Sequence, residues 1–107
     1  MNEKLNENLN KINGFYLYDD HVANQYISLI NESIELIRGI KAPATSMLDN
    51  AKNEAITELS NELVNRMNES FFHANFERKR SEFKISKMLV GVAIGNVLSN
   101  MPSVDES

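Results

Sequence analysis

The feature that most constrains this chain is a long stretch without a helix breaker: no Gly or Pro occurs between Ala44 and Met88. Apolar residues recur through it at the three- and four-residue steps of one helical face. They are Leu48, Ala51, Ala55, Leu59 and Leu63, joined by Ile56, Met67, Phe71 and Ala74. The pattern predicts one helix over about 46–79, which at ~1.5 Å per residue is about 50 Å long.

That length conflicts with the width of a compact chain of 107 residues, which is about 35 Å across. Either the helix breaks, near Ser60 and Asn61 or near Ser70, or the protein is elongated and packs its long helix against another chain. We favour the second alternative, because nothing in the stretch is a strong breaker. We therefore expect a homodimer.

Apolar stripes predict three further helices, over about 3–13, 20–39 and 82–100. The longest stripe lies in 20–39 and consists of Ala23, Ile27, Ile30, Ile34, Ile37 and Ile40. Asp19 or Asp20 can cap the start of that helix, and Ser46 with Asp49 can cap the long helix. The fold class expected is all-α: an elongated bundle of four helices forming a single domain over 1–101, with a disordered acidic tail over 102–107.

The last helix is apolar on nearly all sides, which is typical of a central helix. Gly91, Gly95 and Ser99 lie four residues apart and form a ridge of small residues along it. Two glycines inside a helix cost about 1 kcal/mol each relative to Ala. The ridge therefore predicts the close approach of another helix, either the chain's own second helix or a second copy.

Composition and charge exclude several classes. The chain has no Cys, which excludes disulfides, thiol nucleophiles and cysteine zinc sites. No apolar run is long enough for a bilayer and no signal peptide is evident, so we expect a cytoplasmic protein without membrane contact. The net charge of −4 divides into −5 over residues 1–65, +3 over 66–101 and −2 over 102–107.

Residues that could carry catalysis or bind metal are few. His73 lies four residues from Glu69 and from Glu77, on one helical face, while His21 lies beside Asp19 and Asp20. Glu and His at four-residue spacing are ordinary surface pairs, and di-metal bundles use a Glu-x-x-His step that this chain lacks. We expect no enzyme, no metal and no cofactor.

Two phenylalanines point away from the main stripe of the predicted long helix. If Phe71 continues that stripe, Phe72 and Phe76 lie about 100° and 140° away from it. Either the bundle surrounds this segment, or Phe72 and Phe76 contact a partner.

The expected function is non-catalytic binding of another protein by a small intracellular helical module, such as an adaptor, inhibitor, secretion chaperone or immunity-type factor. Its candidate interface consists of Phe72, Phe76, Gly91, Gly95 and Ser99. The alternative is a small dimeric DNA- or RNA-binding regulator, mostly through a loop near residue 80. Its contacts would be Arg78, Lys79, Arg80, Lys84 and Lys87, with phenylalanines interleaved for stacking.

Overall fold

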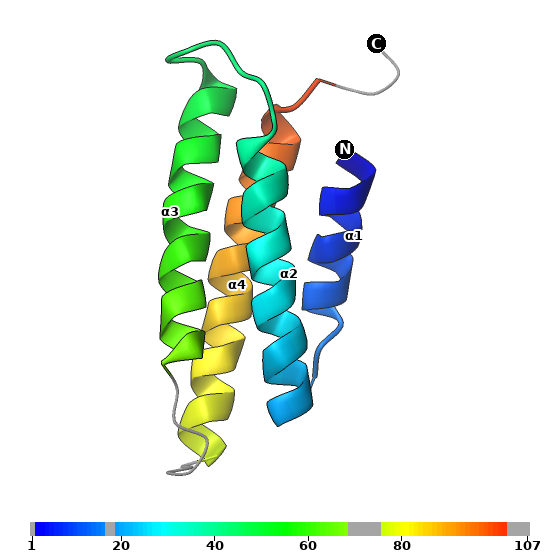
Figure 1. Cartoon of the computed structure of the whole chain (residues 1–107), viewed down its shortest axis with the longest axis vertical. Helices are drawn as coiled ribbons and strands as arrows, with labels where there is room; N and C mark the ends of the chain where they lie inside the picture. Colours follow the sequence, from blue (N-terminus) through cyan, green and yellow to red (C-terminus); the bar gives the residue numbers. More distant parts are fainter. Residues whose placement is uncertain (1, 17–18, 69–75, 103–107) are drawn as a thin grey trace.

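The computed structural model describes residues 2–16, 19–68 and 76–102. This part of the chain forms helices and no strand: α1 (Asn2–Asn13), α2 (Asp20–Arg38), α3 (Met47–Met67) and α4 (Phe76–Asn100). Each helix runs antiparallel to the next, and the last helix, α4, lies beside the first, α1 (Figure 1). The longest extent of 48 Å is twice the next, 24 Å. The prediction of an all-α bundle of four helices is confirmed for the described residues.

The local signals for helix ends are mostly correct. Asp19 accepts a hydrogen bond from the Val22 backbone N–H at 2.8 Å, and Ser46 accepts one from the Asp49 N–H at 3.1 Å. The prediction for α4 is wrong at its start, because α4 begins at Phe76 rather than at residue 82. Glu, Arg and Lys in that segment are all good helix formers, so nothing stops the helix from starting earlier.

The stretch predicted as one helix over 46–79 is divided in the structure. α3 ends at Met67, and the Asn68 N–H bonds the Val64 carbonyl at 3.0 Å. Residues 76–79 belong to α4, which packs antiparallel against α3 (Figure 1). This pairing lets the two segments bury their apolar faces against each other within one chain. Residues 69–75 and 103–107, including most of the predicted acidic tail, lie outside the described residues. The helix-length argument for a dimer no longer applies.

The core is formed by the inner faces of all four helices. From α2 it takes Ala23, Ile30, Ile34 and Ile37 of the predicted stripe, together with Tyr26. The other members of the core are Leu5 and Ile12 of α1, Ala51, Ala55 and Leu59 of α3, and Phe83, Val90, Ala93, Ile94 and Val97 of α4, with Ile40 after α2. Most of these positions follow the predicted stripes, but Met67, which the stripe of the predicted long helix includes, is 63% exposed.

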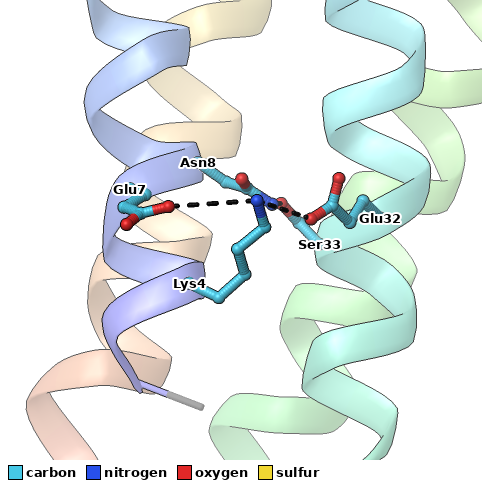
Figure 2. A network of polar contacts seen from close by, with 5 residues as sticks. All are labelled: Lys4, Glu7, Asn8, Glu32 and Ser33. Atoms are coloured by element: carbon cyan, nitrogen blue, oxygen red, sulfur yellow. Dashed lines mark hydrogen bonds and ion pairs between the residues drawn. The ribbon is translucent and has the colours of Figure 1, made fainter.

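The short helix α1 is held by polar contacts as well as by its apolar face. Lys4 lies between Glu7, at 3.9 Å, and Glu32 of α2, at 3.4 Å (Figure 2). Next to these residues, the buried Asn8 Nδ2 donates to Ser33 Oγ at 3.3 Å (Figure 2). Because this hydrogen bond forms in one alignment of the two helices only, it favours that position of α1 along α2.

Tyr26 lies where the linker after α1, helix α2 and helix α4 meet. Its ring makes edge-to-face contacts with Phe83, at 5.0 Å between centroids, and with Phe15, at 6.4 Å. Its hydroxyl is 2.7 Å from Ser86 Oγ. Burial raises the pKa of Tyr26 above its ordinary value of 10.0, with the Ser86 hydrogen bond opposing the shift and the Glu62 charge adding to it.

The raised pKa of Tyr26 predicts a loss of stability in alkali. The folded state holds the phenol proton more tightly than the unfolded chain does, so this contribution is complete below pH ~10 and is lost as pH rises toward the folded pKa. We expect this group to lower the free energy of unfolding by about 1.4 kcal/mol per pH unit in that range. Tyr26→Phe should remove the part of the pH dependence of the free energy of unfolding that Tyr26 contributes. Urea unfolding between about pH 9 and pH 11 measures this change.

Tyr16→Phe is the matched control, because the Tyr16 side chain is 86% exposed. This variant should keep the slope of the wild-type protein. Equal slopes for the wild-type protein and Tyr26→Phe would contradict the prediction.

Candidate functional site

Helix α4 has two apolar faces, of which only one packs in the core. Phe83, Val90 and Ile94 point inward and are at most 1% exposed. Ile85, Met88 and Val92 point outward and are 54%, 60% and 59% exposed. The expectation that α4 is a central helix is therefore wrong, since its neighbours cover one side of it only.

The outward residues follow the spacing of a helix–helix seam. Ile85, Met88, Val92, Gly95 and Ser99 succeed one another at steps of three, four, three and four, which is the repeat that faces a partner helix in a coiled coil. We call these five residues the outer seam. A Cβ at Gly95 would meet no atom within 4 Å, and Ser99 is exposed, so the seam stays open at its C-terminal end.

The residues of the predicted ridge of small residues do not all face the same neighbour. A Cβ at Gly91 would lie 3.6 Å from Asn13 Oδ1 and 3.8 Å from Leu9 Cδ1, so Gly91 borders α1. Gly95 and Ser99 belong to the outer seam instead. The helix beside the ridge is thus α1, not the second helix of the chain, and it borders only the Gly91 end.

Beside the seam, the surface is hollowed between α3 and α4. A hollow of about 290 Å³ lies against Met88 and Val92, and the small side chains Ala51 and Ala55 of α3 leave this space. Glu54 and Glu58 of α3 and Asn96 of α4 also line this hollow. Farther along, Ile85 borders a second hollow of about 440 Å³, which is also lined by Glu62, Asn65, Arg66, Asn68 and Glu82.

Carboxylates therefore line the α3 margin of the outer seam. Glu54 is exposed and Glu58 is half-buried, and they lie one helical turn apart. The opposite margin, formed by α1, presents Leu9 and Asn13 beside Gly91. One side of the seam is acidic and the other is uncharged at that point.

The basic residues predicted as a nucleic-acid contact lie on the first turns of α4 rather than in a loop. Arg80 and Lys84 are exposed, and Lys79 is half-buried. Lys87 donates to the Phe15 carbonyl and lies 5.1 Å from the centre of the Phe83 ring. Through these two contacts, Lys87 holds the linker after α1 in place. Arg78 is in α4, but its side chain lies outside the described residues.

The predicted aromatic contacts lie beyond what the structure describes. Phe72 falls in the segment 69–75, and for Phe76 only the backbone is described. The same holds for His73 and Glu69, and for the side chain of Glu77. His21 is exposed and borders a hollow of about 660 Å³ together with Lys11 and Phe15.

Comparison of the chain with models of protein families, with curated proteins and with solved structures finds no match. Among the described residues, no three His, Cys, Asp or Glu side chains are grouped so that they could hold a metal ion. Within the same residues, no helix has the length and the apolar character needed to cross a membrane.

Sequence reasoning missed the three large apolar residues of the seam and the two glutamates beside it. The signal was present, because the steps from Ile85 to Ser99 form a second apolar repeat beside the core repeat of α4. The same pattern also fits a central helix, because periodicity alone does not say how many neighbours surround a helix.

Proposed function

We propose that this protein is a non-catalytic helical module that binds another protein by receiving one of its helices on the outer seam. The observation that supports the proposal is the seam itself: three large apolar side chains, each more than half exposed, at the spacing of a helix contact. Contiguous apolar surface of this kind is typical of interaction sites. Amphipathic helices that lie in apolar grooves use the same spacing, and Met adapts readily to such partners.

The polar groups of the core do not favour a catalytic role. Tyr26 and Ser86 form a hydrogen-bonded hydroxyl pair, but they are 0% and 1% exposed. A substrate has no access to hydroxyls at that depth. Their geometry supports a structural role at the junction of α2 and α4.

A regulator that binds nucleic acid is the weaker alternative. Arg80 and Lys84 are available on the surface, but Lys87 is engaged with Phe15 and Phe83, and carboxylates flank the outer seam. Binding through phosphate contacts would retard nucleic acid at low salt and disappear as salt rises. Retardation that is lost in Arg80→Gln/Lys84→Gln would support this alternative.

The proposal is tested with a displayed library of helical peptides selected on the wild-type protein. Selected helices should lose affinity by about fivefold or more for Val92→Asn, because full burial of a valine is worth about 1.5–3 kcal/mol and a partner can bury only the 59% of Val92 that is exposed. Val64→Asn is the matched control, since Val64 is 54% exposed on α3. Helices that bind both variants equally well would place the binding site elsewhere.

Gly95 gives a prediction that separates stability from binding. Gly95→Ala should raise the free energy of unfolding by about 1 kcal/mol, because Ala favours the helix and the new Cβ has open space. Gly95→Leu should also stay folded, but it should weaken a selected helix by blocking close approach. Thermal unfolding and peptide titration measure the two effects. Unchanged peptide affinity in Gly95→Leu would remove Gly95 from the interface.

A second copy of the chain is one candidate for the partner, as the predicted homodimer requires. Sedimentation of the wild-type protein and of Val92→Asn measures this directly. A dimer that dissociates in Val92→Asn would show that the seam joins two copies.

A further inference from the structure

We infer that the occupant of the outer seam is a basic amphipathic helix of another protein, whose Lys or Arg side chains lie over Glu54 and Glu58. This inference rests on the proposed function, because it names the chemistry of the helix that the seam receives. It adds which edge of that helix carries charge, and of which sign.

The acidic margin is built into the groove rather than scattered on the surface. Glu54 and Glu58 lie one turn apart on α3 and line the same hollow as Met88 and Val92. A helix whose apolar side chains fill that hollow therefore brings its flanking residues next to both carboxylates. On the α1 margin, the neighbours of Gly91 are Leu9 and Asn13, which carry no charge. Beside Met88 and Val92, the groove thus favours a cation on the α3 edge of the incoming helix.

Charge complementarity at this margin also gives direction and selectivity. Opposite charges that meet at a partly desolvated rim strengthen binding, and like charges reject the wrong helix. The two glutamates should therefore discriminate between helices with the same apolar stripe.

A second copy of this chain fits the charges less well. It carries the same net charge of −4. If two seams pair antiparallel about a two-fold axis, α3 of one copy faces α3 of the other, and Glu54 and Glu58 meet their own equivalents. If they pair in parallel, Arg80 and Lys84 of both copies gather at the same end. Both arrangements bring like charges together, whereas a basic helix brings unlike charges together.

An anionic membrane surface or a nucleic acid fits the seam less well for the same reason. The carboxylates beside Met88 and Val92 would repel lipid phosphates and nucleic-acid phosphates alike. Both remain outcomes that the experiment below distinguishes.

The test uses two synthetic helical peptides with an identical apolar stripe. One peptide has Lys at the positions that flank the stripe, and the other has Glu at the same positions. Fluorescence anisotropy measures the binding of each peptide to the full chain. We expect the Lys peptide to bind about tenfold or more tightly than the Glu peptide, with a difference that shrinks as salt rises.

Two double variants assign that difference to the α3 margin. Glu54→Gln/Glu58→Gln should remove most of the preference for the Lys peptide. Glu3→Gln/Asp20→Asn removes the same charge from exposed positions on α1 and α2 and should leave the preference intact. Equal preference in the two double variants would overturn the inference, because the difference between the peptides would then not arise from Glu54 and Glu58.

The outcomes separate this inference from the proposed function. If both peptides bind equally and Val92→Asn abolishes both, the seam receives helices but the basic partner is wrong. If neither peptide binds, or if Val92→Asn has no effect, the proposed function itself fails. A wild-type dimer that becomes monomeric in Val92→Asn, or anionic phospholipid vesicles or nucleic acid bound by wild type but not by Val92→Asn, would also overturn the inference.

Discussion

Tyr26→Ala is expected to lower the free energy of unfolding by about 3–5 kcal/mol, the range for removing a large aromatic from a packed core. The ring is fully buried, and it joins Phe15 of the linker after α1 to Phe83 of α4. Removing it leaves a cavity between three parts of the chain and takes the hydrogen-bond partner from Ser86. Urea unfolding followed by circular dichroism measures the change.

Tyr16→Ala provides the comparison for this prediction, because Tyr16 is 86% exposed. Its effect on the free energy of unfolding should stay within about 0.5 kcal/mol, as for most surface substitutions. Similar losses in the two variants would mean that the linker, and not the core contact, determines the effect.

Tyr26 shows why the N-terminal half of α4 and the linker after α1 depend on each other. Phe15 packs on Tyr26, and the Phe15 carbonyl accepts a hydrogen bond from Lys87. Lys87 in turn lies over the Phe83 ring. The inner face of α4 is thereby packed in the core, and the outer face stays exposed.

Helix ends and core stripes could be predicted where the signal is local. Asp19 and Ser46 cap their helices because each is followed by a free backbone N–H within the first turn. Ile30, Ile34 and Ile37 of α2 face the core because steps of three and four place them on one side. Such signals depend on a few neighbouring residues, so the sequence contains them in full.

The division between α3 and α4 could not be predicted in this way. The sequence offers a break near Ser70 as one alternative, but no Gly or Pro there favours it over a continuing helix. What separates the two helices is the burial gained when they pack antiparallel over most of their length, which depends on residues far apart in the sequence. A long-range energy of this kind overrides weak local preferences.

Buried polar residues mark a second limit of periodicity. Leu5, Asn8 and Ile12 share the inner face of α1, so the steps do place Asn8 inside. They do not reveal its partner, because Ser33 lies on another helix. Glu62 and Arg66 are buried on α3 in the same unexpected manner. The residue type alone would place Asn8, Glu62 and Arg66 on the surface.

The two faces of α4 give the second large prediction, which compares one substitution at two positions. Val90 is 0% exposed on the inner face and Val92 is 59% exposed on the outer seam. Val90→Asn should lower the free energy of unfolding by about 3–5 kcal/mol, because it removes apolar burial and places an unpaired amide in the core. Val92→Asn should change it by less than about 0.5 kcal/mol. Urea unfolding of both variants measures the contrast.

The comparison isolates burial, because the two variants make the same chemical change two residues apart in the same helix. Valine and asparagine have similar helix propensities, so the helix itself is affected little at either position. If Val92→Asn were as destabilising as Val90→Asn, Val92 would be packed within the folded chain, and the outer seam would not be available to a partner. If Val92→Asn is stable, any binding that it abolishes is lost at the surface of an intact bundle. The stability contrast therefore decides whether the binding experiments on Val92 report an interface.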